Sequence, residues 1–89
     1  MRSTATPRFW AAYRDLPLEV RDAARKAYQL FRDNPEHPSL QFKKVHASEP
    51  IYSARVTLGY WAVALVENDQ ATWFWIGGHA DYDRLLSRL

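Results

Sequence analysis

Three apolar runs in the second half of the chain constrain its fold more than any other feature. They cover residues 51–57, 60–66 and 71–76, and all are rich in β-branched and aromatic side chains. Two short turns separate them, Leu58-Gly59 and Asn68-Asp69. Because connections this short join only antiparallel neighbours, the runs predict three consecutive strands of one antiparallel sheet.

The N-terminal part of the chain carries helical periodicity instead. Residues 8–13 place three aromatic side chains at helical spacing and predict a short helix. From Pro17 to Asp33 the apolar residues recur at i, i+3 and i+4, which predicts a second helix with Pro17 in its first turn. That helix should stop at Asn34, because Pro35 disfavours a helical conformation at the residue before it.

Two further elements complete the predicted order. Residues 40–45 alternate as a strand, with Leu40 and Phe42 on one face, and helical spacing returns from Ala80 onward. At 89 residues the chain has room for one core, so we expect a single domain over residues 1–89. The prediction is an α+β fold, in which two N-terminal helices pack on a four-stranded antiparallel sheet with a short C-terminal helix.

The turn after residue 56 decides which strand residues face the helices. A three-residue loop with Gly59 in the left-handed conformation would pair Val56 with Tyr60 and Arg55 with Trp61. Two faces would result, one with Ala54, Val56, Tyr60, Ala62 and Ala64, the other with Ser53, Arg55, Trp61 and Val63. A two-residue loop would put Arg55 and Trp61 on opposite faces. We favour the first register, because it removes Arg55 from the alanine-rich face.

Composition excludes several classes of site. The chain has no cysteine, so disulfides and thiolate metal sites are ruled out. Its three histidines, His37, His46 and His79, lack metal-ligand spacing, and we expect no metal and no other cofactor. Neither a signal-like apolar segment nor a run of membrane-spanning length is present, so we expect a cytoplasmic protein without a membrane partner. The net charge of +2 is only mildly basic.

Cationic and aromatic residues along the predicted sheet are candidates for binding nucleic acid. They are Lys43, Lys44 and His46 near the first strand, Arg55 on the second, His79 after the last, and the aromatic residues Trp61, Trp75 and Tyr82. Gathered on one surface, the cations could bind a phosphate backbone while aromatic rings stack unpaired bases. Alternatively, Lys43 and Lys44 only protect an edge strand from aggregation, and the tryptophans build the core.

Some of these residues are also suited to metal-independent RNA cleavage. That reaction needs a base at the ribose 2′-hydroxyl, an acid at the leaving 5′-oxygen and cations around the phosphate. His79 and Tyr82 are three residues apart and would be neighbours on the closing helix, while Arg55 could hold the phosphate. The structural alternatives are that His79 orders the preceding glycine turn and that Tyr82 packs with the leucines that follow it.

Four segments together resemble the RelE/ParE superfamily of toxins from bacterial type II toxin–antitoxin systems. They are LPLEVRDAARKAYQLF, NPEHPSLQFKKV, YSARV with the following GYWAV, and WFWIGGHADYDRLL. The resemblance covers nearly the whole chain and implies a compact α+β fold of the microbial-RNase type. It also implies a small cognate antitoxin that covers the active surface. Exposed strand edges would allow a homodimer or a toxin–antitoxin hetero-oligomer.

The function that the resemblance implies is of one of two kinds, and a third possibility is a toxin-derived domain that now only binds its antitoxin. RelE-like members cut mRNA on the ribosome, whereas ParE-like members inhibit DNA gyrase without a nuclease site. The ribonuclease type is the first expectation, with mRNA on the ribosome as the second partner. On that reading the catalytic residues are His79, Arg55 and Tyr82, and the RNA-binding residues are Lys43, Lys44, His46 and Trp61.

Trp61 departs from the family pattern, because RNA-cleaving relatives usually carry an arginine at this position. A neutral indole cannot stabilise the charge of the transition state, and loss of such a group commonly costs on the order of 10²–10³ in rate. Two explanations remain open. Trp61 is an inactivating replacement of an arginine, or it is native and stacks a base or contacts the antitoxin.

Overall fold

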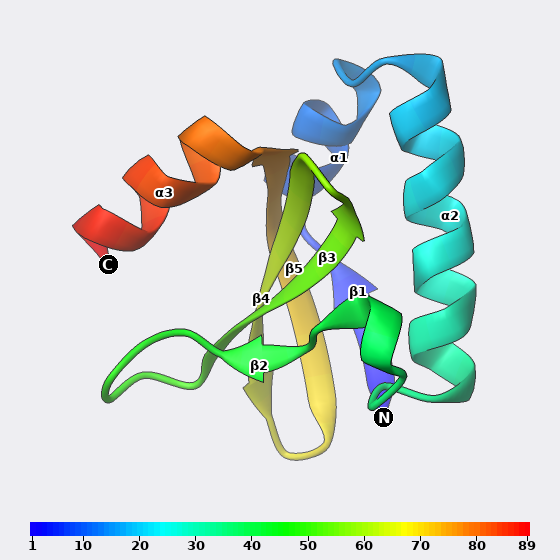
Figure 1. The fold of residues 1–89 in the computed structure, drawn as a ribbon. Helices are drawn as coiled ribbons and strands as arrows, with labels where there is room; N and C mark the ends of the chain where they lie inside the picture. Colours follow the sequence, from blue (N-terminus) through cyan, green and yellow to red (C-terminus); the bar gives the residue numbers. More distant parts are fainter.

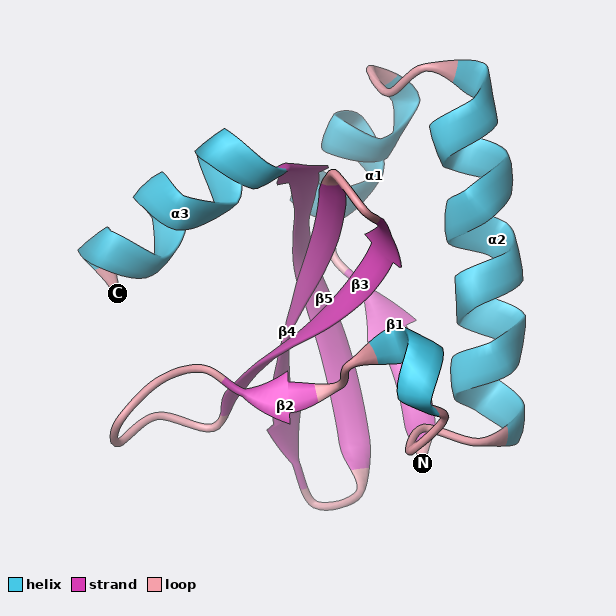
Figure 2. Ribbon diagram, in the orientation of Figure 1, coloured by secondary structure: helices cyan, strands magenta, loops and turns pink.

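The computed structural model describes residues 1–89 as a five-stranded sheet with helices on both of its faces (Figures 1 and 2). The elements are β1 (Arg2–Ala5), α1 (Pro7–Arg14), α2 (Leu18–Asp33), a 3₁₀ turn (Pro38–Leu40), β2 (Lys43–Lys44), β3 (Ile51–Thr57), β4 (Tyr60–Glu67), β5 (Gln70–Gly78) and α3 (His79–Arg88). The strand order is β1-β5-β4-β3-β2. All neighbours are antiparallel except β1 and β5, so the predicted α+β class is confirmed.

The first strand was not predicted, and the sheet therefore has five strands rather than four. β1 runs parallel to β5 and pairs Ser3 with Ala71 and Ala5 with Trp73. Its sequence, Arg-Ser-Thr-Ala, is short and mostly polar, and no local pattern marks it as a strand. Only its distant partner β5 supplies the hydrogen bonds that make it one.

The strand predicted over residues 40–45 is shorter than expected. Leu40 ends the 3₁₀ turn, and Gln41 adopts a left-handed conformation with φ of 46°, which interrupts any strand before Lys43. Only Lys43 and Lys44 pair with β3. Leu40 and Phe42 nevertheless pack into the same core, as the alternation indicated.

The helix boundaries follow local signals. α1 begins at Pro7 because the Thr6 hydroxyl oxygen accepts the backbone N–H of Phe9 at 3.1 Å. α2 begins one residue later than predicted, with Pro17 as the residue before its first turn, and it stops where Pro35 forces Asn34 into an extended conformation. None of the helices combines the length and apolar character needed to cross a membrane.

The two hairpin turns reverse the chain with different backbone conformations. Asn68 and Asp69 both have positive φ, 53° and 61°, which matches the right-handed twist of β4 and β5. Gly59 does not adopt the predicted left-handed conformation. Thr57 pairs with Tyr60 across a two-residue turn, so the predicted pairing of Val56 with Tyr60 is wrong.

A bulge at Val56 restores the register on the far side of that turn. The extra residue is left without a partner on β4, and Arg55 pairs with Trp61 as predicted. The predicted register is thus confirmed at Arg55, although a bulge rather than a left-handed glycine produces it.

The sheet separates two apolar cores. Small residues cover the face toward α1 and α2, where Ala54, Ala62, Ala64 and Ala71 pack with Phe31 and Trp73. The other face packs against α3 through Ile51, Trp61, Val63 and Tyr82. Figure 1 shows α2 and α3 on opposite sides of the strands. The predicted division of Ala54, Ala62 and Ala64 from Trp61 and Val63 is therefore confirmed.

Candidate functional site

The strand register gathers part of the predicted site on the α3-facing surface of the sheet. Lys43 pairs with Ser53, and Arg55 pairs with Trp61. Because paired residues of antiparallel strands point to the same face, Lys43 and Arg55 share the face that carries Trp61. His79 begins α3 at the end of β5 and contacts Trp61 directly. We call Lys43, Arg55 and His79 the cationic face.

The other two predicted RNA-binding residues near β2 lie elsewhere. Lys44 pairs with Tyr52 on the opposite face of the sheet, where Tyr52 stacks on Phe42. His46 orders the loop after β2, because its Nδ1 accepts the backbone N–H of Ser48 at 3.2 Å and of Glu49 at 2.9 Å. Of the two lysines, therefore, only Lys43 belongs to the cationic face.

Tyr82 is buried beneath this surface. Its side chain is 6% exposed, and its hydroxyl donates to the Ser53 hydroxyl oxygen at 2.8 Å. Its ring stacks on Trp61, with centroids 5.0 Å apart, and packs at a tilt against Trp75. These contacts correspond to the packing role that the sequence left open beside catalysis, and proton transfer by Tyr82 would require α3 to move.

Trp61 is buried beneath the cationic face and contacts His79. The residue is 9% exposed, and one face of its indole is covered by the Tyr82 ring at an interplanar angle of 13°. Its N–H donates to Nδ1 of His79 at 3.2 Å. These contacts favour Trp61 as an integral part of the fold, and they leave little of its ring for stacking a base.

His79 is exposed, and contacts on both sides hold it in place. Its side chain is 58% exposed, and Nε2 lies 3.3 Å from Oδ2 of Asp83, one turn further along α3. Its backbone N–H donates to the carbonyl of Gly59 at 2.8 Å and fixes the start of α3 against the β3–β4 turn. Sequence reasoning missed Asp83, although its i, i+4 spacing from His79 was a usable signal. No cluster of three or more histidines or carboxylates could hold a metal ion.

Gly77 leaves room for the ring of Trp75, which packs against Tyr82. A Cβ at Gly77 would lie 2.7 Å from Cζ2 and 2.9 Å from Cη2 of Trp75. We expect Gly77→Ala to displace the Trp75 ring and lower the free energy of unfolding by about 1–3 kcal/mol, as overpacking does. Urea denaturation followed by tryptophan fluorescence measures this. Gly59→Ala is the matched control, because a Cβ there meets nothing within 4 Å; equal losses in both variants would contradict the clash.

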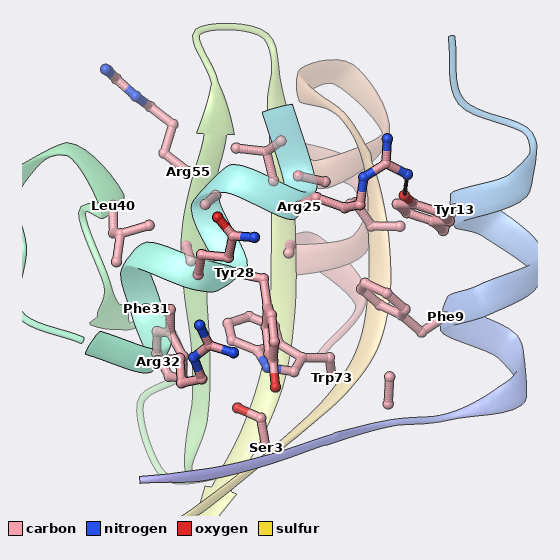
Figure 3. A pocket seen from close by; sticks show the side chains of 18 of the residues that line it. Ser3, Phe9, Tyr13, Arg25, Tyr28, Phe31, Arg32, Leu40, Arg55 and Trp73 are labelled. Carbon is pink, nitrogen blue, oxygen red and sulfur yellow. Dashed lines mark hydrogen bonds between the residues drawn. The ribbon is translucent and has the colours of Figure 1, made fainter. Parts of the chain in front are cut away.

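An apolar cavity lies on the opposite side of the sheet, between α1, α2 and the strands (Figure 3). Its volume is about 500 Å³, and its apolar lining includes Phe9, Trp10, Tyr13, Tyr28, Phe31 and Trp73. The indole N–H of Trp73 is buried without a hydrogen-bond partner. Arg55 borders this cavity, but Figure 3 shows its guanidinium directed away from the other lining side chains. We call this the helix-side cavity.

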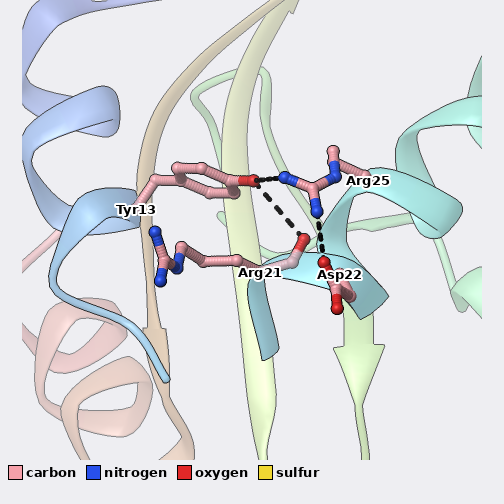
Figure 4. Close-up of polar contacts among 4 residues, drawn as sticks. All are labelled: Tyr13, Arg21, Asp22 and Arg25. Carbon is pink, nitrogen blue, oxygen red and sulfur yellow. Dashed lines mark hydrogen bonds and ion pairs between the residues drawn. The ribbon is translucent and has the colours of Figure 1, made fainter. Parts of the chain in front are cut away.

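Polar contacts connect α1 and α2 along one part of this cavity (Figure 4). The Tyr13 hydroxyl accepts from Nη1 of Arg25 at 3.1 Å, and it donates to the carbonyl of Arg21 at 3.5 Å. Arg25 also pairs with Asp22. Arg32 borders the cavity as well, with its guanidinium 3.8 Å from the Asp33 carboxylate. An apolar interior is thus flanked by two exposed arginines.

Comparison with known proteins gives different results for the sequence and for the fold. No protein-family model and no curated protein matches the sequence. Solved structures do match along almost the whole chain. The RelE toxin in the RelB–RelE complex from Methanococcus jannaschii superposes with a TM-score of 0.73 over 90% of this chain and 95% of its own, at 16% identity. The chain has the fold of the RelE toxins.

Two further structures share this fold. YafQ from E. coli strain BL21(DE3) matches with a TM-score of 0.73 over 92% of this chain and 98% of its own, at 11% identity. The intact E. coli RelBE toxin–antitoxin complex matches with a TM-score of 0.66 over 88% of this chain and 95% of the matched one, at 17% identity. A fold can be shared at 11–17% identity, because it depends on the pattern of buried and exposed positions rather than on identical residues.

Proposed function

We propose that this RelE-like chain is the toxin of a toxin–antitoxin module and that it cleaves mRNA bound to the ribosome. The observation that carries the proposal is the cationic face, where the exposed ring of His79 stands at the edge of a surface that also holds Arg55 and Lys43. A phosphodiester fits such a face, because two long cationic side chains can bind its oxygens from the strands while an imidazole approaches from α3.

The reaction that these residues support needs no metal ion. The ribose 2′-hydroxyl oxygen attacks the neighbouring phosphorus and gives up its proton to solvent water, while the bond to the 5′-oxygen of the next nucleotide breaks and that oxygen takes up a proton from water. Arg55 and Lys43 stabilise the negative charge that builds up on the phosphate oxygens. His79 donates a hydrogen bond to the leaving oxygen. Tyr82 supports the site by stacking on Trp61 and by its hydrogen bond to Ser53.

The helix-side cavity suits part of the antitoxin that such a toxin requires, on the face opposite the active surface that the antitoxin is expected to cover. The RelE toxins from M. jannaschii and E. coli were each crystallised with the antitoxin RelB. Here the cavity is apolar inside, Arg25 and Arg32 flank it, and two large side chains beside it are exposed, Trp10 at 47% and Tyr28 at 44%. An amphipathic antitoxin helix with acidic flanking residues would bury the aromatic rings and pair with the arginines.

A cell-free bacterial translation system tests the ribonuclease proposal. Reporter mRNA is mapped by primer extension after adding the protein, and cleavage is expected only at ribosome-bound codons. His79→Ala and Arg55→Ala should each slow cleavage by about 10²–10³, as loss of a transition-state donor does. His37→Ala is the matched control, because His37 orders the 3₁₀ turn through the backbone N–H of Ser39 and is not part of the cationic face. If the wild-type protein leaves mRNA intact, or if His79→Ala cuts normally, the proposal fails.

A gyrase inhibitor of the ParE type is the second candidate. One observation favours it: Tyr82 is buried. The family resemblance also implies an arginine at position 61, and Trp61 in its place would leave the catalytic set incomplete. A supercoiling assay with purified gyrase separates the two functions. An inhibitor should block supercoiling whether or not His79 is replaced by alanine, while leaving translation untouched.

A further inference from the structure

We infer that Trp61 and Asp83 are positioning residues that hold His79 as its Nε2–H tautomer, with Nε2 as the donor available to RNA. The effect of this arrangement on cleavage rests on the proposed ribonuclease function, whereas the tautomer assignment rests on the hydrogen-bond geometry alone. It gives Trp61 a role in the site at the position where relatives usually carry an arginine.

The tautomer follows from the hydrogen-bonding capacity of the partners. An indole N–H can only donate, so the nitrogen that it meets at 3.2 Å, Nδ1 of His79, must present its lone pair. A neutral imidazole then carries its hydrogen on Nε2, where the Asp83 carboxylate oxygen lies 3.3 Å away and can only accept. A flipped ring would set carbon atoms against both partners, so one orientation satisfies both contacts.

Trp61 is the fixed member of this arrangement. It lies on the central strand β4 between Arg55 of β3 and Gly77 of β5, and its ring is clamped against Tyr82. Asp83 is 63% exposed, and an exposed contact of this kind orients the ring only weakly by itself. The buried indole therefore determines which nitrogen of His79 faces outward.

The consequence concerns which chemical role His79 can take. In the neutral ring Nδ1 is occupied by Trp61 and Nε2 carries a hydrogen, so neither nitrogen is free to accept the proton of a 2′-hydroxyl. The outward Nε2–H can exchange Asp83 for a phosphate oxygen bound near Arg55. Trp61 thus excludes the base role of His79 and leaves it the role of a hydrogen-bond donor.

Nitrogen NMR of the uniformly ¹⁵N-labelled protein tests the arrangement without any activity. In alkaline buffer, where imidazole rings are neutral, we expect a scalar coupling through the hydrogen bond from Nε1 of Trp61 to Nδ1 of His79, and the Nε2–H tautomer. Trp61→Phe keeps an aromatic ring on Tyr82 but removes the donor, and it should raise the Nδ1–H fraction several-fold. Tyr82→Phe is the control, because it removes a hydroxyl of the same cluster that contacts Ser53 rather than His79. Absence of the coupling, or an unchanged tautomer in Trp61→Phe, overturns the inference.

Cleavage kinetics then test positioning separately from the proposed function. We expect Trp61→Phe to lower kcat about tenfold with KM unchanged, as loss of one ordinary hydrogen bond predicts. Asp83→Asn should retain more activity than Asp83→Ala, because its side-chain oxygen still accepts from Nε2. Normal cleavage by Trp61→Phe would overturn the positioning role. If the coupling is present but the wild-type protein cuts no RNA, the proposed function fails and the tautomer assignment stands.

Discussion

Phe31→Ala is expected to lower the free energy of unfolding by about 3–5 kcal/mol, the usual range for removing a buried phenylalanine. Phe31 is 2% exposed and, with Val20, is one of only two buried residues on α2. Its ring meets Trp73 and Phe42 edge to face, with centroids 5.2 Å and 4.9 Å apart. The substitution would therefore detach the helix from the sheet at its best-packed point.

Urea denaturation of the purified protein measures this effect. A domain of this size is stable by roughly 5–15 kcal/mol, so the variant should unfold at a much lower urea concentration. Tyr28→Ala is the matched control, because Tyr28 lies one turn earlier on α2 and is 44% exposed. We expect that variant to lose less than about 1 kcal/mol. Similar losses in both would mean that α2 is not anchored through Phe31.

Trp61→Arg is expected to destabilise the protein by about 2–4 kcal/mol and to lower mRNA cleavage below that of the parent. The substitution replaces a ring that is stacked on Tyr82 with a guanidinium that must remain charged. It also removes the indole N–H that binds His79. If Trp61 is an integral part of the site, both the packing and the orientation of His79 are lost together.

Thermal unfolding and the cell-free cleavage assay, run on the same preparations, decide this prediction. Trp10→Arg is the control for introducing an arginine, because Trp10 lies on α1 and is 47% exposed. It should leave both stability and mRNA cleavage close to those of the parent. A stable Trp61→Arg variant that cuts mRNA where the parent does not would instead identify Trp61 as an inactivating replacement of a family arginine.

Much of the fold could be predicted because its signals are local. The strand Ile51–Thr57 was predicted to the residue, and the turn at Asn68-Asp69 followed from residues that tolerate positive φ. Alternation along the strands separated the alanine-rich face from the face with Trp61. The aromatic and cationic residues that the sequence singled out include the three that share the cationic face.

The errors and omissions have a common cause in contacts between distant residues. β1 is a strand only because it forms backbone hydrogen bonds with β5, and the bulge at Val56 is defined only by the pairing of β3 with β4. Whether Lys43 or Lys44 faces α3 depends on how β2 meets β3, since a shift of one residue exchanges the two faces. The role of Asp83 is apparent only from the tertiary structure, where His79 lies between Asp83 and Trp61.

The sequence by itself determined the order of helices and meander strands, the division of the sheet into two faces and the candidate residues of the site. These depend on hydrophobic periodicity and turn chemistry, which act over a few residues. Only the tertiary structure decided that Tyr82 and Trp61 are buried while His79 is exposed, and that an indole fixes the outward nitrogen of that histidine. Burial and hydrogen-bond partners depend on side chains brought together from β3, β4 and α3, and no local pattern specifies them.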